Sequence, residues 1–179
     1  SQQALSLNDA RLKHLPTLNL RLDLNTSVLD AGCGLGHLSQ FFVDRGCKVT
    51  AIDARQSNID KAKEQYPNLD CHCLDIELDS LSKHFAQFDL VLCYGLLYHL
   101  ENPTLALRNL SSVCRSTMLV ETLVCDSSLP ILRLEKEDSN ARDQSLYGLG
   151  VRLSPSFVVQ VLKHVGFQKV VSPNQKPDH

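Results

Sequence analysis

Three glycines at alternate positions follow a short apolar run that ends in an acid. Residues 27–36 read Ser-Val-Leu-Asp-Ala-Gly-Cys-Gly-Leu-Gly, and a helical pattern begins directly after them. Because Gly32, Gly34 and Gly36 carry no Cβ, the backbone can turn sharply there and approach a ligand closely. The free N–H groups at the start of the following helix point at the same place. The segment therefore predicts a small-molecule site at the carboxyl end of a first strand.

The glycine spacing distinguishes this loop from other ligand-binding loops. The dinucleotide fingerprint G-x-G-x-x-G would place its third glycine one residue later, where His37 stands. The sequence also contains no G-x-x-x-x-G-K-[ST] phosphate loop. A tight turn without a ligand is the alternative, although a turn requires one glycine rather than three. The spacing disfavours a nicotinamide-dependent oxidoreductase.

A second acid stands where a ribose-binding residue is expected. Asp53 ends the next apolar run, about 20 residues beyond Gly32, and an acid at that distance suits a bidentate grip on ribose hydroxyls. The alternative is a carboxylate that only caps the next helix. Asp75 follows a third run, in Cys-Leu-Asp-Ile, and a plain turn acid is its alternative.

Residues 27–36 resemble motif I of the class I S-adenosylmethionine-dependent methyltransferases, whose pattern is an acid, a spacer and G-x-G-x-G. The resemblance implies S-adenosylmethionine as cofactor and S-adenosylhomocysteine as product. It assigns Asp53 to the ribose, and Asp75 with the backbone N–H of Ile76 to the adenine. On the same resemblance, Asp30 orients the glycine loop or the amino-acid end of the cofactor.

Residues 88–103 resemble motif IV of the same family and its extension. They read Phe-Asp-Leu-Val-Leu-Cys-Tyr-Gly-Leu-Leu-Tyr-His-Leu-Glu-Asn-Pro, which is similar to the Tyr-His-Leu-x-x-Pro segment of many small-molecule methyltransferases. The resemblance places Cys93 and Tyr94 beside the methyl-bearing sulfonium. His99 is then the candidate general base, because an imidazole titrates near physiological pH. The alternative is a histidine that only holds the loop.

Four further residues are assigned to the acceptor substrate. Tyr98 is expected in the pocket wall. Glu121 is a charge in an apolar run, and it either lines the acceptor site or pairs with another buried group. Tyr147 and Arg152 belong to residues 126–153, a long connection of the kind that forms functional lids. We expect this connection to close over the acceptor.

The elements that position these residues alternate between strand and helix. Apolar runs predict strands over residues 28–30, 48–53, 69–74, 88–94, 118–125 and 168–171. Helical patterns predict helices over residues 37–45, 58–66, 81–85, 103–114 and 155–165. This alternation implies right-handed crossovers and a doubly wound sheet, which binds ligands at the carboxyl ends of its strands.

We therefore expect one α/β methyltransferase domain over residues 1–179, with a Rossmann-like, doubly wound and mostly parallel sheet flanked by helices. Residues 1–26 are expected to form an N-terminal helix and a lead-in. A strand over residues 18–24 is the alternative to an extended lead-in. The sequence ends at His179, so the final antiparallel strand of the family is expected to be missing. The exposed sheet edge would then allow two copies to pair as a dimer.

Composition narrows the partners. The chain has 179 residues with a formal net charge of −2, and its bases form no run or stripe, which argues against a nucleic-acid surface. No segment is apolar and long enough to span a membrane, and no leader pattern is visible. Seven cysteines without a C-x-x-C predict buried thiols in a reducing cytoplasm and no metal site.

The sequence thus predicts methyl transfer to an oxygen or nitrogen of a small-molecule acceptor. One alternative is a tRNA-modifying transferase, because residues 88–125 are also similar to the catalytic domain of the tRNA wobble-uridine carboxymethyltransferases. Those enzymes carry an extra basic domain that this sequence lacks, which disfavours RNA. The other alternative is a catalytically silent module that binds the cofactor or a partner.

Overall fold

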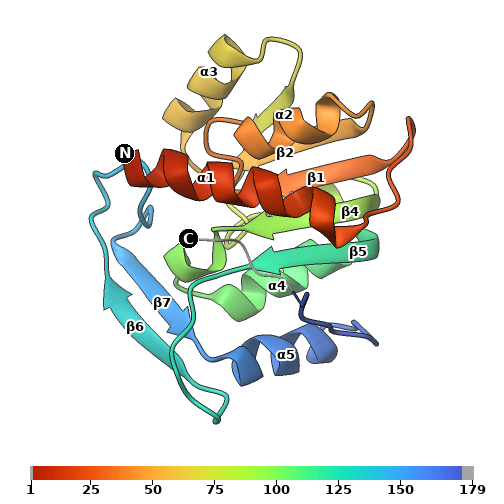
Figure 1. Cartoon of the computed structure of the whole chain (residues 1–179). Coiled ribbons are helices and arrows are strands. Elements are labelled where there is room, and N and C mark those ends of the chain that lie inside the picture. The colour runs from red at the N-terminus through yellow and green to blue at the C-terminus, as the bar shows by residue number, and fades with distance from the viewer. Residues whose placement is uncertain (1, 175–179) are drawn as a thin grey trace.

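A five-stranded parallel sheet forms the centre of the protein. The computed structural model describes residues 2–174 and places helices on both faces of this sheet (Figure 1). The strand order is β3-β2-β1-β4-β5, so the order reverses between β1 and β4, where ligands bind in such sheets. The strands are β1 (Ser27–Ala31), β2 (Lys48–Asp53), β3 (Asp70–Cys73), β4 (Phe88–Tyr94) and β5 (Cys114–Glu121).

The helices divide between the two faces of the sheet (Figure 1). One face carries α1 (Gln2–His14), α2 (His37–Val43) and α3 (Gln56–Gln65), and the other carries α4 (Pro103–Ser112) and α5 (Pro155–His164). Both α4 and α5 begin with a proline after a capping side chain. Asn102 Oδ1 accepts from the N–H of Leu105, and Ser154 Oγ accepts from the N–H of Phe157.

Two apolar clusters fill the space between the sheet and its helices. Alternate residues of β1 point to opposite faces, so Leu29 packs toward α4 whereas Val28 packs toward α2 and α3. Asp30 shares the face of Val28, and its side chain is buried against α2. The buried β1 strand therefore holds the start of the glycine loop rigidly at the carboxyl edge of the sheet.

The long connection after β5 contains a β-hairpin. Its strands are β6 (Leu132–Lys136) and β7 (Leu149–Leu153), which pair antiparallel. Figure 1 shows this hairpin beyond the carboxyl ends of β4 and β5. Val151 and Leu153 are fully buried in the same cluster as α4. The base of the hairpin is thus part of the core, and only its tip, residues 137–148, extends over the sheet edge.

Gly150 allows β7 to pass close to the turn that follows β4. A Cβ built at this position would clash with the backbone oxygen of Tyr98 and would lie 2.6 Å from Glu137 Oε1. A side chain there would push β7 away from the turn that carries His99. The glycine is required for this close approach.

The structure corrects several predicted elements. Residues 168–171 form no strand, because Phe167 and Val170 both pack inward and their three-residue spacing does not match the two-residue period of a strand. Strand β5 begins at Cys114, four positions before the predicted start at 118, because polar residues are tolerated on this edge strand. Residues 19–24 form no strand, so the extended lead-in is the correct alternative.

Candidate active site

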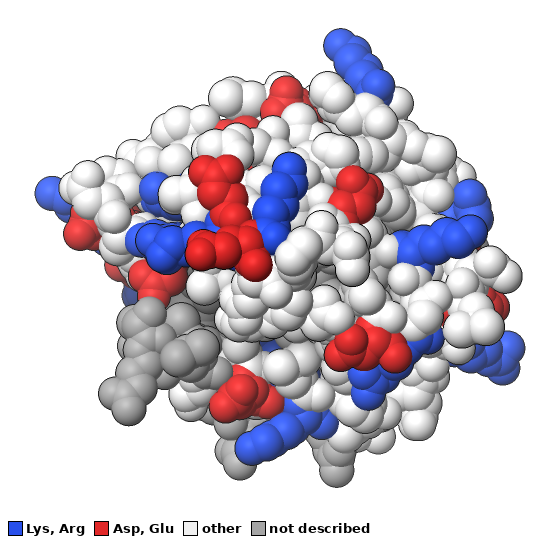
Figure 2. Space-filling model, turned by 90° about the horizontal axis from the view of Figure 1, so that it is seen from above, with Lys and Arg blue, Asp and Glu red and all other residues white. Residues whose placement is uncertain are grey.

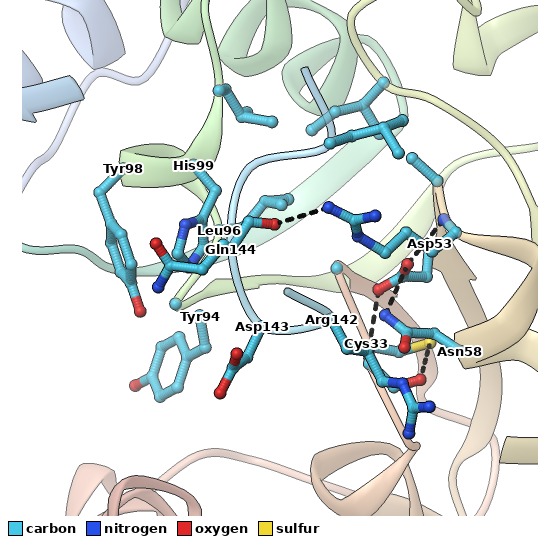
Figure 3. Close-up of a pocket in the computed structure, with 18 of the residues that line it drawn as sticks. Cys33, Asp53, Asn58, Tyr94, Leu96, Tyr98, His99, Arg142, Asp143 and Gln144 are labelled. Carbon is cyan, nitrogen blue, oxygen red and sulfur yellow. Dashed lines mark hydrogen bonds between the residues drawn. The ribbon is translucent and has the colours of Figure 1, made fainter. Parts of the chain in front are cut away.

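A cavity of about 900 Å³ lies at the carboxyl ends of the central strands. This volume lies within the usual range of ligand sites. Its walls come from the glycine loop, from the residues that follow β2, β3 and β4, from the hairpin tip and from α1. Figure 3 shows Cys33, Asp53 and Asn58 on one side of it, and Tyr98, His99 and Gln144 on the other.

The glycine loop presents open backbone to this cavity. Gly34 has a φ of +54°, and a Cβ built there would meet nothing within 4 Å. A side chain at this position would therefore project into ligand space rather than into the protein. Gly32 lines the same wall. Gly36 is the N-cap of α2 and does not line the cavity, since its Cβ would face Leu69 and Tyr66 instead.

Asp53 connects the glycine loop to α3. Its Oδ2 accepts from the N–H of Gly34 at 3.0 Å, and its Oδ1 accepts from the N–H of Arg55 at 2.9 Å and from the Asn58 amide at 3.1 Å. Burial raises the pKa of this carboxyl, and these hydrogen bonds oppose the rise. Three of the roughly four acceptor positions of the carboxylate are thereby used, which leaves one, on Oδ2, in a residue that lines the cavity.

Asp75 and Ile76 also line the cavity, beyond the end of β3. Asp75 Oδ1 accepts from the N–H of Glu77 at 2.8 Å, which shapes the turn. Its Oδ2 accepts from the hydroxyl of Tyr147 at 2.6 Å. This hydrogen bond raises the pKa of Tyr147 to about 12. The bond ties the hairpin tip to the loop after β3.

Besides Gly36, two further residues assigned to the cofactor do not line the cavity. Asp30 is 1% exposed and accepts from Ser39 Oγ at 2.6 Å, so it anchors α2 from beneath. Burial raises its pKa to about 6. Cys93 is fully buried in the core cluster on the opposite face of the sheet. Both side chains point into the packed layers on the faces of the sheet, because strand side chains alternate between the two faces rather than project from the strand end.

His99 lies in the short 3-10 turn Leu97–His99 that follows β4, and Glu137 is its partner. The His99 Nδ1 atom and Glu137 Oε2 are 2.5 Å apart. The His99 side chain is 17% exposed and that of Glu137 is 4% exposed. Burial lowers the pKa of His99, although Glu137 acts in the opposite direction. The carboxylate therefore fixes one edge of the imidazole, and the burial favours its neutral form.

Two tyrosines stand beside His99. Tyr94 and Tyr98 line the cavity, and the Tyr98 and His99 ring centroids are 4.1 Å apart. Burial raises the pKa of Tyr94 to about 12 and also raises that of Tyr98. Both hydroxyls thus stay protonated at neutral pH and shape the pocket rather than act as bases.

The acceptor assignment of Glu121 finds no support in the geometry. Glu121 does not line the cavity. Its Oε2 forms an ion pair of 2.6 Å with Arg11 Nη2, which links the end of β5 to α1. Arg11 itself lines the cavity and is 7% exposed. Arg152 lines the cavity as well, and its guanidinium carbon lies 5.5 Å from the Tyr98 ring centre.

The hairpin tip is attached to the loops after β2, β3 and β4. Arg55 Nη2 donates to the backbone oxygens of Gln144 and Ser145 at 3.2 and 2.8 Å. Tyr147 reaches Asp75, and Glu137 reaches His99. Figure 3 shows Asp143 and Gln144 directed into the cavity. The tip therefore closes one side of the site.

The sequence alone assigns no role in the site to several of the residues that line it. They are Arg11, Arg55, Asn58, Glu137, Asp143 and Gln144. Glu137 belongs to a charged run, Glu-Lys-Glu-Asp, that reads as a solvent-exposed segment. Asp143 and Gln144 were foreseeable only as members of a long loop. Periodicity identifies buried apolar faces, whereas these polar residues become buried through contacts between distant segments.

Some ligands and partners receive no support from the described residues. Residues 2–174 contain no group of three or more His, Cys, Asp or Glu side chains arranged to hold a metal ion. On the face shown in Figure 2, basic and acidic side chains alternate without a broad basic area. No helix in the described part of the chain is both long and apolar enough to cross a bilayer.

The comparisons with known proteins agree with this site. Residues 28–117, half of the chain, match the family model described as "Methyltransferase domain". The chain belongs to this methyltransferase family. The family model spans the glycine loop, Asp53, Asp75 and His99, so the strand-end part of the cavity lies in the matched residues, whereas its α1 and hairpin-tip walls lie outside them. The expected class I S-adenosylmethionine-dependent methyltransferase is thereby confirmed.

Two curated relatives illustrate the sequence similarity. The methyltransferase domain is 34% identical over 114 residues to the ubiquinone biosynthesis O-methyltransferase of Coxiella burnetii (strain Dugway 5J108-111), covering 61% of this chain and 47% of that protein. It is 31% identical over 126 residues to the malonyl-[acyl-carrier protein] O-methyltransferase of Enterobacter lignolyticus (strain SCF1), covering 70% of this chain and 47% of that protein. The chain thus spans about half the length of these relatives.

A solved structure confirms the predicted Rossmann-like fold. The N-terminal domain of EvdMO1 with SAH bound superimposes with a TM-score of 0.70 at 19% identity, covering 92% of this chain and 72% of that domain. Identity at this level shows the arrangement of strands and helices, and it does not transfer a substrate.

Proposed function

We propose that this protein binds S-adenosylmethionine in the 900 Å³ cavity and transfers its methyl group to an oxygen or nitrogen of a small-molecule acceptor. The observation that carries the proposal is the open backbone at Gly34, where a Cβ would enter ligand space, in the same cavity that the His99–Glu137 pair lines. The O-methyltransferase names of the two relatives support the same reaction class.

The residues of the cavity fit this cofactor. The glycine loop would accept its amino-acid end, because no side chain fills the space above Gly34. Asp53 keeps one acceptor position for the ribose, and Asp75 with Ile76 would hold the adenine. Asp75 would exchange its contact with Tyr147 for one with the adenine amino group, or would bind both through its two oxygens. Asp30 and Cys93 would contribute indirectly, by supporting the loop and the end of β4.

The bound sulfonium supplies an already activated methyl group, so the protein's own residues need to orient the acceptor, exclude water and remove a proton. Orientation falls to the walls formed by Tyr94, Tyr98 and Arg152, and holding two reactants in line lowers a barrier by several kcal/mol. His99 would accept the proton of the attacking group at Nε2, because its Nδ1 is engaged by Glu137. The hairpin tip would cover the reacting groups as a lid.

Binding measurements test the cofactor directly. Titration calorimetry with S-adenosylmethionine, S-adenosylhomocysteine and NAD should show binding of the first two and none of the third. Binding of NAD in place of both would overturn the proposal. Transfer of a labelled methyl group from S-adenosylmethionine to a panel of phenols, amines and acyl-carrier thioesters then separates an enzyme from a silent cofactor-binding module.

The surface charges and the cysteines support two further proposals, on the class of acceptor and on the cellular compartment. We propose a small molecule rather than tRNA as acceptor, supported by the mixed charges of Figure 2. We also propose a reducing, cytoplasmic compartment, supported by the seven cysteines, which are all free. Two copies paired through the outer edge of β5 remain a proposal that sedimentation would test.

A further inference from the structure

Glu137 is a buried carboxylate that contacts the His99 ring. It follows β6 directly, 38 residues from His99 in sequence, and its side chain is 4% exposed. Its Oε2 accepts from the backbone N–H of Ser145 at 2.6 Å and contacts His99 Nδ1 at 2.5 Å. Its Oε1 is 3.7 Å from Arg152 Nη1. A carboxylate removed from water to this extent requires such partners to remain stable.

These contacts determine which nitrogen of His99 carries the proton. A carboxylate only accepts hydrogen bonds, so His99 Nδ1 has to be the donor. In the neutral ring the lone pair then resides on Nε2. Because Nδ1 is turned toward Glu137, Nε2 is the nitrogen that remains available to the cavity that His99 lines. The free histidine side chain has no such constraint and can carry its proton on either nitrogen.

We propose that Glu137 is the positioning residue of the active site, which fixes the Nδ1–H tautomer of His99 and thereby selects a hydroxyl group as the acceptor. This inference rests on the proposed function and specifies its acceptor atom. A neutral amine attacks with a lone pair that is already free, and it can release its proton afterwards to water. A hydroxyl is a weak nucleophile until a base takes its proton, so an oriented base favours hydroxyl acceptors.

The proposed step balances in atoms and charge. The acceptor oxygen forms a bond to the methyl carbon while its proton passes to His99 Nε2. The carbon–sulfur bond breaks, its electron pair stays on sulfur, and the positive charge of the sulfonium is replaced by that of the imidazolium. Glu137 stabilises this imidazolium through the Nδ1 hydrogen bond. The proton leaves to water once the methylated product has departed.

Other charged groups around His99 also shift its pKa, some in the same direction as Glu137 and some in the opposite direction. Arg152 on β7 disfavours a positive charge on His99, whereas Asp143 in the hairpin tip favours it. Burial disfavours the charge most strongly, so the pKa of His99 lies below its ordinary value. Removing the charge of Glu137 should lower this pKa further, because the hydrogen bond to Glu137 is the largest opposing contribution.

Nitrogen-15 spectra of the imidazole rings test the tautomer without cofactor or acceptor. Ring shifts of His99, assigned from the signals lost in His99→Asn, should report Nδ1–H in the wild-type protein. In Glu137→Gln the ring should titrate at a lower pH, and in Glu137→Asp, whose shorter side chain withdraws the carboxylate, it should become a mixture of tautomers. Unchanged tautomer and unchanged titration in both variants would overturn the role of Glu137.

The matched control is Glu135→Gln. Glu135 lies two residues away on β6, pairs with Arg133 and is more exposed than Glu137. The Glu135→Gln substitution removes the same charge from the same hairpin and should leave the His99 spectrum unchanged. An equal spectral change in Glu135→Gln would show that the hairpin, rather than the contact with Glu137, determines the tautomer.

Acceptor preference is tested with catechol as the hydroxyl probe and aniline as the amine probe, using methyl-labelled S-adenosylmethionine. Glu137→Gln should slow catechol methylation by roughly tenfold or more, as the loss of an orienting partner commonly does, and should slow aniline methylation much less. An equal loss on both probes, or a wild-type protein that methylates aniline alone, would overturn the hydroxyl assignment. Cofactor calorimetry is independent of both outcomes, so failure of the proposed function would be seen separately.

Discussion

At the scale of single residues, the environment of His99 suits the proton removal proposed for it. The neighbouring hydroxyls of Tyr94 and Tyr98 are held protonated, because burial raises their pKa values. Burial instead lowers the pKa of His99, which favours the neutral imidazole. A base that is already unprotonated can accept a proton without a preceding ionisation step.

Replacement of His99 by alanine should therefore separate catalysis from binding. We expect the methyl-transfer rate to fall by roughly 10²–10⁴, the usual contribution of a positioned base, with cofactor affinity nearly unchanged. The wild-type rate should rise with pH through the His99 pKa, which lies below its ordinary value of 6.5, and this dependence should vanish in the variant.

The control for this variant is His72→Ala, a histidine on β3 that pairs with Asp70 and does not line the cavity. It should keep the wild-type rate and pH profile. If His99→Ala also turned over at the wild-type rate, His99 would be a structural residue that holds the turn after β4.

The negative charge of the buried Asp30 lowers the free energy of unfolding. Its pKa is about 6 in the folded protein against 3.8 in the unfolded chain. Between these values the folded state retains a proton that the unfolded state has released, so the free energy of unfolding decreases as pH rises through this window. Asp30→Asn keeps an acceptor for Ser39 without the charge. As the pH rises from 4 to 8, the free energy of unfolding of the variant should increase relative to that of the wild type by up to about 3 kcal/mol.

Urea unfolding of both proteins at the two pH values measures this gain. Asp89→Asn is the contrasting control, because hydrogen bonds from Ser27 lower the pKa of Asp89. Stability from a lowered pKa is present above the unfolded value and is lost on acidification, so Asp89→Asn should be destabilising at pH 8. A gain in Asp30→Asn that does not change with pH would contradict the argument.

At the scale of elements, the β1–loop–α2 unit brings a strand end and a helix start together without side chains in between. We predict that Gly34→Val abolishes cofactor binding, because its side chain would occupy the open space beside Gly34. The positive φ of +54° adds strain, at a cost of roughly 1–3 kcal/mol in stability. Calorimetry with S-adenosylmethionine and thermal unfolding measure the two effects.

Gly166→Val provides a matched comparison. Gly166 also has a positive φ, of +114°, and open space around its Cβ position, but it follows α5 and does not line the cavity. This variant should lose stability and keep cofactor affinity. Tight binding of S-adenosylmethionine by a folded Gly34→Val protein would rule out the assigned glycine loop.

The hairpin tip should act on the acceptor rather than on the cofactor. Replacing residues 138–144 by a short Gly-Ser turn removes Arg142, Asp143 and Gln144 and keeps the attachments through Glu137, Ser145 and Tyr147. We expect cofactor affinity to be preserved and acceptor turnover to be lost, since lid closure excludes water from the transfer step. Equal loss of both in calorimetry and turnover assays would show that the tip is structural.

At the scale of the whole molecule, the cavity is shared by segments from all parts of the chain. Residues of α1, four strand ends and the hairpin tip face the same space. A ligand that fills this space should therefore stabilise the molecule as a unit. S-adenosylmethionine at a hundred times its Kd should add about 2.7 kcal/mol to the free energy of unfolding, which is roughly 5–10 °C in Tm for a chain of this size.

Differential scanning calorimetry with and without the ligand measures this shift. NAD at the same concentration should leave Tm unchanged, because the glycine spacing disfavours a dinucleotide. A shift that appears with NAD and not with S-adenosylmethionine would assign the cavity to a different cofactor.

The sequence by itself determined the alternation of β1–β5 with helices, the glycine loop and the placement of Asp53, Asp75 and His99 after strand ends, but not the β6–β7 hairpin. These features depend on short-range properties, namely the period of apolar residues, helix caps and the backbone freedom of glycine. The early start of β5 was beyond it, because that start depends on pairing at the edge of the sheet. The predicted strand over residues 168–171 was wrong, because Phe167 and Val170 both pack inward at a spacing that does not fit a strand.

Only the tertiary structure decided which polar residues meet. Glu137 with His99, Arg11 with Glu121 and Tyr147 with Asp75 join segments far apart in the chain. A charged residue in a polar run carries no periodic signal of burial, and its partner depends on the path of the hairpin over the sheet. The glycine loop is recognisable because its geometry is local, whereas His99 and Glu137 form a pair only after the hairpin packs against the turn that follows β4.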